Sequence, residues 1–310
     1  MICLYLILPL IKEFFLTSER NYLYSTHTLN PSATVFNQSV PRITGLGRMC
    51  LLLFFLLFFI QEKLLNIKKY LILIILFLIN MLIYSFQSRG VLIGWFVFFF
   101  YYFIFFKTRL LRKIITIVIL FLLPIISYET IKFYKHYNKL ISSPFETEKI
   151  FSENRFIYKL ESSSGRLGLW QVSAKIIKEE KIIFGRGPQT DRKLIYEYKS
   201  VLNPGAYIEN NSSNALIYSY LCGGVVSASL LIMIYYMICK VIYKTLFTNI
   251  SSSTKDPLIN FSIVTLIYLT LRTIFENGYS VFGFDYFFCL LCYFYLFIFN
   301  EKKTAKNKFI

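Results

Sequence analysis

Long apolar runs separated by short polar segments make up most of this chain. Each run approaches the roughly 20 residues that a helix needs to cross a hydrocarbon core, and the shorter ones need flanking residues to complete the crossing. The pattern predicts an all-α integral membrane protein, a multi-spanning helical bundle of about eight spans. The predicted spans are residues 1–11, which lack a signal-peptide cleavage site, Leu46–Ile60, Tyr70–Phe86, Val91–Phe106, Ile114–Tyr128, Asn214–Cys239, Leu258–Ile274 and Tyr286–Phe299.

One long polar interval, residues 129–213, interrupts these runs. Within it, serines at 162–164 are suitable caps for an amphipathic helix from about Gly165 to Glu180. Arg166 and Trp170 lie one turn apart on this helix and share a face. The interval divides the chain into N-terminal spans (1–128), a loop (129–213) and C-terminal spans with a tail (214–310).

A glycine-rich turn follows the predicted loop helix. Gly185 and Gly187 flank Arg186, and Pro188 comes next. Glycines allow a turn in which backbone N–H groups converge on an anion. We therefore expect Gly185, Arg186 and Gly187 to bind part of an anionic substrate.

The charge distribution predicts the orientation of the spans. The chain is 56% hydrophobic with a formal net charge of +17, and its lysines gather in alternate connections. The positive-inside rule then places residues 61–69, 107–113, 240–255 and the tail from 301 in the cytoplasm. Both termini are cytoplasmic in this arrangement, the loop 129–213 is extracytoplasmic, and the chain is a multi-pass plasma (inner) membrane protein in contact with membrane lipid. The basic excess is explained without nucleic acid.

Arginines gather on the predicted outer face. Besides Arg166 and Arg186, they include Arg89 in a tight turn, Arg272 near the end of the seventh span, and Arg42 and Arg48 beside the second span. Ionisable groups in a membrane usually face a cavity or a partner, and the guanidinium group suits pyrophosphate better than an ammonium does. The alternative for any one of them is anchoring to lipid headgroups.

Candidate acids and bases are few. Glu276 follows Arg272 by about one turn and is a candidate general base or simply a partner for that arginine; Asp285, at the start of the last span, is a second candidate. The chain contains no P-loop, dinucleotide fingerprint, zinc-ligand set or nucleophile elbow, so we expect no metal and no cofactor. A DxD-type metal site for nucleotide sugars is also absent, so we expect a donor that is carried in the membrane rather than a sugar nucleotide.

The order of five short motifs resembles the O-antigen ligase/polymerase family of bacterial envelope enzymes. The motifs are PRITGLGR, QSRG before a span, SGRLGLWQ, KIIFGRGPQ and NSSNALIYSYLCGG at the start of a span. The resemblance implies a GT-C-like glycosyltransferase that uses polyprenyl-pyrophosphate-linked oligosaccharide on the extracytoplasmic side. It also implies that Arg89, Arg166 and Arg186 hold the pyrophosphate, with Trp170, Arg272 and Asn214 in the substrate site. A chain-length regulator and a flippase are candidate partners.

One departure bears on the reaction. Ligases of this family carry a histidine just before the asparagine that opens the span after the loop, and here Ser213 precedes Asn214. Serine is not a base near neutral pH. The sequence therefore favours an O-antigen or capsule repeat-unit polymerase, with Glu276 as the candidate base. The alternatives are a ligase with another base and a non-enzymatic polysaccharide flippase or transporter, although no internal repeat indicates a transporter.

Overall fold

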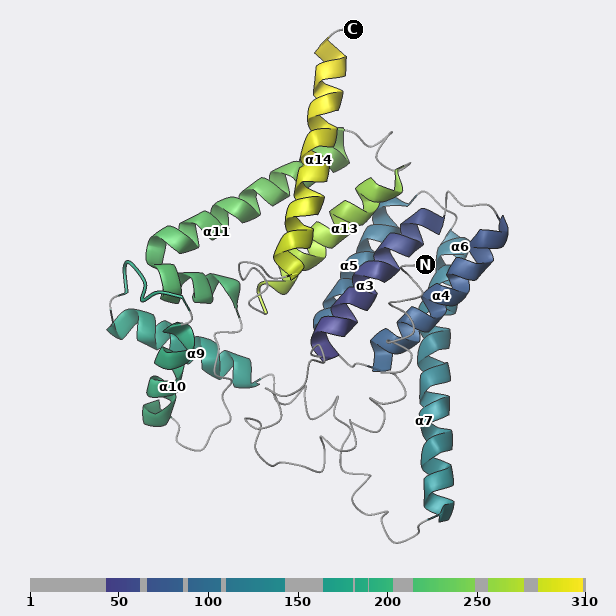
Figure 1. Ribbon diagram of the computed structural model, residues 1–310, viewed down its shortest axis with the longest axis horizontal. Coiled ribbons are helices and arrows are strands. Elements are labelled where there is room, and N and C mark those ends of the chain that lie inside the picture. The colour runs from purple at the N-terminus through teal and green to yellow at the C-terminus, as the bar shows by residue number, and fades with distance from the viewer. Residues whose placement is uncertain are drawn as a thin grey trace.

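The described parts of the chain fold into helices. The computed structural model describes residues 43–61, 66–85, 89–106, 110–142, 164–180, 182–188, 190–202, 214–248, 256–275 and 284–308, and all regular elements in these ranges are helical. They are α3 (Ile43–Ile60), α4 (Asn66–Ser85), α5 (Arg89–Phe105), α6 (Leu110–Ile117), the π-helix η2 (Val118–Leu122), α7 (Leu123–Ser142), α9 (Ser164–Glu179), α10 (Thr190–Leu202), α11 (Ala215–Thr248), α13 (Pro257–Arg272) and α14 (Phe284–Lys308) (Figure 1). The predicted all-α class is confirmed. The predicted first span, residues 1–11, lies outside the described residues.

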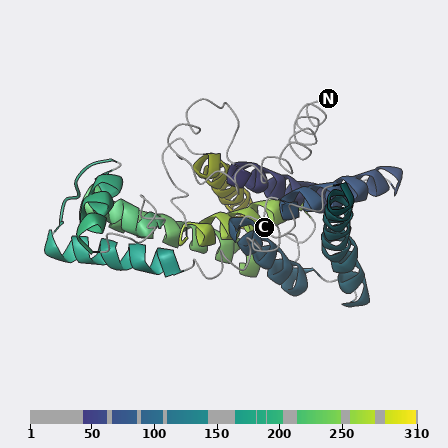
Figure 2. The ribbon, with the colours of Figure 1, turned by 90° about the horizontal axis from the view of Figure 1, so that it is seen from below.

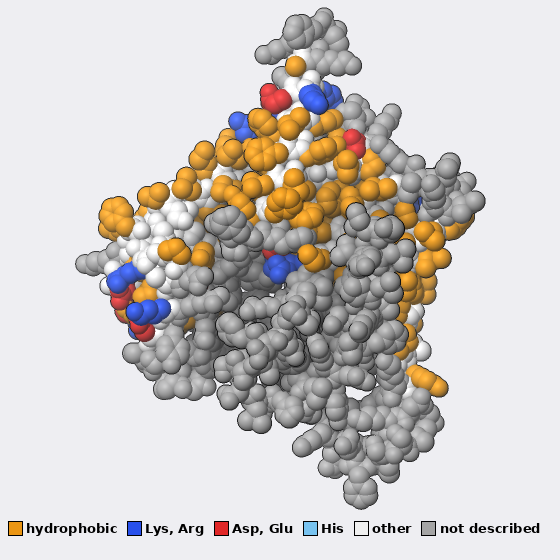
Figure 3. All heavy atoms as spheres, in the orientation of Figure 1, with side chains coloured by type: hydrophobic (Ala, Val, Ile, Leu, Met, Phe, Trp, Pro, Cys, Tyr) orange, Lys and Arg blue, Asp and Glu red, His pale blue; other side chains and the backbone are white. Residues whose placement is uncertain are grey.

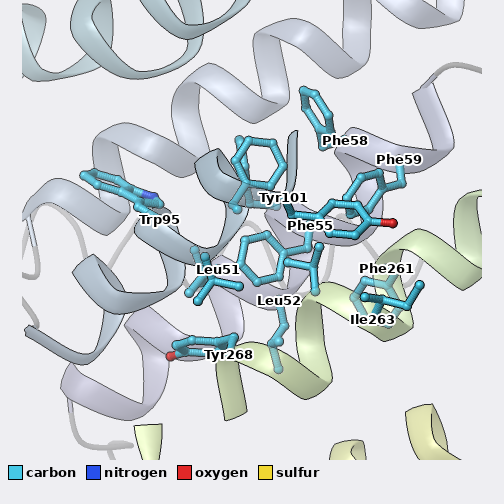
Figure 4. Packing of buried hydrophobic residues seen from close by; sticks show 14 of the residues in the cluster. Leu51, Leu52, Phe55, Phe58, Phe59, Trp95, Tyr101, Phe261, Ile263 and Tyr268 are labelled. Atoms are coloured by element: carbon cyan, nitrogen blue, oxygen red, sulfur yellow. The ribbon is translucent and has the colours of Figure 1, made fainter. Parts of the chain in front are cut away.

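An aromatic core holds the central helices together. Helix α3 packs against α4, α5 and α13, and α13 also packs against α14. The Phe55 ring stacks on Phe98 at 5.7 Å and meets the edge of Tyr268 at 6.1 Å, so α3, α5 and α13 share one cluster (Figure 4). Gly94 allows the close approach, because a Cβ there would lie 2.1 Å from a methyl group of Leu51.

The outward faces of these helices are apolar. On α5, Phe96, Phe100 and Phe103 are exposed, and exposed leucine, isoleucine and methionine side chains follow the same spacing on α4 and α11. Hydrophobic side chains cover α11, α13 and α14 in the face shown in Figure 3. A helix that is apolar on its outer face as well as its inner face is typical of a membrane span.

Two apolar helical stretches exceed the length needed to span a membrane. They are Leu110–Ile131 and Ala215–Phe247, and four shorter apolar stretches accompany them: Gly47–Ile60, Lys69–Tyr84, Gly90–Phe105 and Pro257–Arg272. The shorter stretches match predicted spans to within a few residues. The sequence pattern therefore located these helices well, whereas the two long ones differ from the prediction.

The fourth described span is longer than predicted and contains a π-helix. We expected Ile114–Tyr128, whereas α6, η2 and α7 form one continuous helical run from Leu110 to Ser142. Pro124 has no N–H to donate to the Leu120 carbonyl, one turn earlier. The Asn80 side chain of α4 donates to that carbonyl instead, at 2.6 Å. The proline thus explains both the local distortion and a buried asparagine within the bundle.

Helix α11 is broken, which the prediction of a single span at Asn214–Cys239 missed. It runs for 34 residues to Thr248, and at Gly224 the backbone leaves the helical region, with φ 68° and ψ −157°. Figure 1 shows the two parts of α11 running in different directions. Residues 215–223 therefore form a short first part, and the second part, from Val225, is the long apolar helix.

One end of the bundle carries the loop helices, and we call it the loop end. Helices α3, α5 and α14 begin there, α4 and α13 end there, and α11 starts there (Figure 1). Figures 1 and 2 both place α9 and α10 at the side of the molecule away from α4 and α7. The loop end thus gathers residues that are far apart in the sequence.

Candidate functional site at the loop end of the bundle

Helices α9 and α10 form a small unit with its own core. The helix predicted at Gly165–Glu180 is confirmed as α9, whereas α10 was not predicted. Leu169 and Ile176 of α9 pack with Ile195 of α10 and Leu221 of α11, and each of these side chains is fully buried. The first part of α11 therefore belongs to this unit, whereas the second part of α11 packs in the membrane bundle.

The glycine-rich turn passes over the break in α11 so closely that the two backbones form hydrogen bonds with each other. Arg186 N–H donates to the Leu221 carbonyl at 3.0 Å, Gly187 N–H donates to Cys222 at 2.8 Å, and Val225 N–H donates to Ile183 at 2.9 Å. The Val225 N–H, which would donate to the Leu221 carbonyl in an unbroken helix, donates to Ile183 instead, and the Arg186 N–H takes its place on Leu221. We call residues 183–187 together with 221–225 the glycine crossing.

The glycine crossing requires a glycine in each of its two segments. Gly185 and Gly224 have φ of 75° and 68°, in the left-handed region. A Cβ on Gly185 would lie 2.4 Å from the Cys222 oxygen, and a Cβ on Gly224 would lie 2.0 Å from the Ile183 oxygen. Two N–H groups that we expected to face an anion, those of Arg186 and Gly187, are instead bonded to backbone carbonyls. The geometry gives these glycines a positioning role.

Asn214 fixes the start of α11 on the end of α13. Its Oδ1 atom accepts hydrogen bonds from the N–H groups of Leu216 and Ile217, at 2.8 and 3.1 Å, as a helix N-cap does. Its Nδ2 atom donates to the Ile274 carbonyl at 2.9 Å, and the Ala215 N–H donates to the Thr273 carbonyl at 2.9 Å. The Asn214 side chain thus bonds to backbone groups of α11 and of the turn that follows α13, and the substrate contact expected from the sequence stays a prediction.

Trp170 lies where α9 meets the same end of α13. Its ring is tilted against Phe275, with 6.5 Å between the ring centroids. The indole Nε1 atom is buried and has no hydrogen-bond partner among the described residues. Trp170 of α9 and Asn214, at the start of α11, therefore both contact the turn that follows α13.

Three charged side chains meet beside this junction. Oδ2 of Asp285 accepts from Nη1 of Arg48 at 2.5 Å and also from Nη1 of Arg272. Arg272 and Asp285 are almost fully buried, at 3% and 4% exposed. Among the described residues Asp285 pairs with Arg272, because the start of α14 lies against the start of α3 and the end of α13. Glu276, which the sequence suggested as a partner for Arg272, lies outside the described residues. We call Arg48, Arg272 and Asp285 the arginine–aspartate cluster.

Arg186 points along the surface of the loop unit. Its guanidinium group pairs with Oε2 of Glu180, whose Oε1 accepts from the Tyr198 hydroxyl at 3.0 Å. That hydrogen bond to Glu180 is the main reason why the pKa of Tyr198 is raised above its ordinary value, followed by desolvation. The three side chains join α9, the glycine-rich turn and α10.

The remaining predicted residues are only partly placed. Arg166 lies in the first turn of α9 and Arg89 is the first residue of α5, so both backbones lie in helix starts; their side chains are not among those described. Glu276 lies outside the described residues. The structure thus brings Trp170, Asn214 and Arg272 together at the end of α13, while Arg186 lies with the glycine crossing at the other end of residues 215–223, about 13 Å along the helix axis.

Helix α10 and the break in α11 were not predicted, although the sequence contains a pattern that indicates each of them. Thr190 precedes apolar residues at 194, 195 and 198, a helical spacing that could have indicated α10. The adjacent Gly223 and Gly224 within an apolar run could have indicated the break in α11. No signal in the sequence joins Arg48 to Asp285, which are 237 residues apart.

Comparison with known proteins identifies one family. A family model described as O-antigen ligase matches residues 71–232. The match extends from α4 to the second part of α11 and includes α9, the glycine crossing and Asn214, but neither Arg48 nor the Arg272–Asp285 pair. A search of curated proteins and a search of solved structures each find no match.

The matched segment is 162 of the 310 residues, more than half of the chain. Members of the matched family are glycosyltransferase-like enzymes that act on lipid-linked polysaccharide in the membrane. The apolar helices and the polar unit at one end of the bundle agree with that setting. This chain is a membrane protein and belongs to the O-antigen ligase family.

Proposed function

We propose that this protein is a polysaccharide polymerase of the O-antigen or capsule type, which joins polyprenyl-pyrophosphate-linked oligosaccharide repeat units. An acceptor sugar hydroxyl attacks the anomeric carbon of the donor glycan. The new glycosidic C–O bond forms as the bond from that carbon to the pyrophosphate oxygen breaks, and polyprenyl pyrophosphate leaves. The hydroxyl proton passes to a general base, for which Glu276 is the candidate.

Arginine chemistry supports this proposal. The leaving pyrophosphate gains negative charge, which guanidinium groups can stabilise. Arg272 is held at the loop end by Asp285, and the helix starts that carry Arg89 and Arg166 are at the ends of α5 and α9. A helix N-terminus adds a favourable potential for an anion. We place the pyrophosphate there and assign the loop end to the extracytoplasmic side, with both termini in the cytoplasm.

One observation carries the choice of polymerase over ligase. Ser213 occupies the position before Asn214, where ligases of the family carry a histidine. A serine hydroxyl does not accept a proton near neutral pH, whereas an imidazole does. The ligase remains the second candidate, because the matching family model carries that description.

The glycan profile of a strain that lacks the gene tests the proposal. A polymerase deletion leaves a single repeat unit on the acceptor lipid. Long chains that accumulate on polyprenyl pyrophosphate would identify a ligase, and loss of all extracytoplasmic repeat units would identify a flippase. Complementation with wild-type protein at matched membrane abundance must restore the profile in each case.

A substitution at Ser213 sharpens the distinction. We expect Ser213→Ala to support long-chain glycan at close to the wild-type level, because the hydroxyl performs no proton transfer, and Ser213→His not to create ligase activity. Loss of all product from a normally inserted Ser213→Ala protein would contradict this assignment of position 213.

A further inference from the structure

Helices α11 and α14 meet at the end of the bundle opposite the loop end, which we call the far end (Figure 1). Nδ2 of Asn300 on α14 donates to Oγ1 of Thr245 on α11 at 3.0 Å, and both residues are almost fully buried. Beside this hydrogen bond, the Lys244 ammonium lies 3.3 Å from Oε1 of Glu301. The last turns of the two helices are therefore fixed against each other by polar contacts.

Lysine side chains gather where these two helices meet. Lys240 is exposed one turn before Lys244 on α11, and Lys302 is exposed beside Glu301 on α14, with Lys303 half-buried next to it. Four lysines and one glutamate give these five residues a net charge of +3. We call Lys240, Lys244, Lys302 and Lys303 the lysine group.

Aromatic side chains adjoin the lysine group on the outer surface of α11. Tyr236, Tyr243 and Phe247 are largely exposed, and together with Lys240 they follow the i, i+4, i+7, i+11 spacing of one helix face. Figure 3 shows basic side chains bordering the apolar surface at this end of the molecule. Lysines and aromatic rings on one face are typical of the level at which a helix passes from hydrocarbon to headgroups. A ligand that fits this face has an anionic head and an apolar body.

The contact between the helices does not account for all of this charge. The Lys244–Glu301 pair joins α11 to α14 without Lys240 or Lys302, which are exposed near it. Asp256, the other acidic residue described at this end, caps the start of α13. A phosphate beside the Lys244–Glu301 pair would be attracted by lysines of both helices, since an ammonium on a flexible chain acts as a point charge. A soluble anion would make no use of the exposed rings.

We propose that the lysine group binds the headgroup of an anionic phospholipid. The headgroup lies at the level of Lys240 and Lys302, and the acyl chains run toward the membrane interior past Tyr236 and Met233, which are exposed one and two turns deeper on α11. One bound lipid then bridges α11 and α14 and stabilises their contact. The site lies at the opposite end of the bundle from the candidate functional site and does not depend on the proposed function.

Two neutral substitutions test the site without removing the contact between the helices. Lys240→Gln and Lys302→Gln each remove one exposed charge, and we expect each to weaken phosphatidylglycerol binding by roughly fivefold, the effect of one lysine near an anionic surface. Lys240→Arg keeps the charge and should bind like the wild type. Lys69→Gln on α4 and Arg112→Gln on α6 are matched controls, because both side chains are exposed near the same end of the bundle.

The measurement is native mass spectrometry of the purified full-length protein titrated with phosphatidylglycerol. Phosphatidylcholine is the neutral comparison, and inorganic phosphate is the comparison without an apolar body. Phosphatidylglycerol should also raise the unfolding temperature of the wild type, because a ligand that binds only the folded state stabilises it. This rise should shrink in the protein with both Lys240→Gln and Lys302→Gln. Without added lipid, all variants should unfold at the wild-type temperature, since the substituted side chains are exposed.

Each outcome supports or overturns the site. Wild-type affinity for phosphatidylglycerol in the Lys240→Gln and Lys302→Gln proteins would overturn it. An equal loss of affinity in the Lys69→Gln and Arg112→Gln controls would replace it with a general attraction between the basic far end and anionic lipid. Equal binding of phosphatidylcholine would exclude recognition of charge, and equal stabilisation by inorganic phosphate would assign the lysines to a soluble anion. None of these results bears on glycosyl transfer, which the glycan profile of the deletion strain tests separately.

Discussion

The glycine crossing gives the sharpest prediction about stability. A Gly224→Ala substitution places a methyl group 2.0 Å from the Ile183 oxygen, with the backbone at φ 68° and ψ −157°. That conformation is nearly exclusive to glycine and costs a non-glycine residue about 1–3 kcal/mol. Because the clash is with backbone rather than with a flexible side chain, the crossing must open instead of adjusting.

Opening the crossing removes three backbone hydrogen bonds. Those of Arg186, Gly187 and Val225 contribute roughly 0.5–1.5 kcal/mol each. Together with the backbone strain, we expect Gly224→Ala to destabilise the contact between the loop unit and α11 by about 3–7 kcal/mol. Gly185→Ala should act similarly, because its Cβ would lie 2.4 Å from the Cys222 oxygen.

Gly187 offers the matched control. Its φ is 96°, but a Cβ there would meet no atom within 4 Å. Gly187→Ala therefore adds strain without the clash, and we expect a loss of about 1–2 kcal/mol. The assay is hydrogen–deuterium exchange of residues 182–188 and of the loop helices in the reconstituted protein, together with glycan chain length in cells. Wild-type protection of these amides in the Gly224→Ala protein would refute the argument.

Four further outcomes test other parts of the site. Asn214→Ala should lower stability by about 1–2 kcal/mol through loss of the α11 cap. Asn214→Asp keeps the cap and should retain glycan product. Loss of product in a stable Asn214→Asp protein would instead indicate a substrate role for Asn214. Arg166→Lys should lose long-chain glycan nearly as fully as Arg166→Ala, because lysine lacks bidentate donors, while Lys175→Ala should be tolerated; long chains from Arg166→Lys would favour headgroup anchoring. In a cysteine-free protein, an impermeant thiol reagent applied to intact cells should label Cys introduced at Ser163 but not at Thr108, and the reverse pattern would contradict the topology. The pKa of Tyr198 is raised in the folded protein, so its hydrogen bond to Glu180 is present below the ordinary tyrosine pKa and is lost as the pH rises through the raised pKa of the folded protein. The resulting change in Trp170 fluorescence at alkaline pH should be absent from the Tyr198→Phe protein.

Periodicity and composition determined the helical class and most of the helices. Spans such as Val91–Phe106 are recognisable because every side chain must be apolar where one face meets the core and the other meets lipid. The loop helix α9 was predictable for a different reason, since its caps and its apolar stripe are local features of the sequence. Local rules suffice for elements whose stability depends mainly on burial of one face or on the membrane.

Tertiary structure decided what the candidate site residues do. The break at Gly224 depends on residues 183–187 reaching the carbonyls of α11, and Asn214 depends on the end of α13 lying within hydrogen-bond distance. Asp285 joins Arg48 across 237 positions of sequence only because α3, α13 and α14 meet at one end of the bundle. Hydropathy shows where a helix lies but not which face or end it presents to another helix. Whether a glycine, an asparagine or an aspartate contacts substrate or supports its neighbours therefore had to come from the packing.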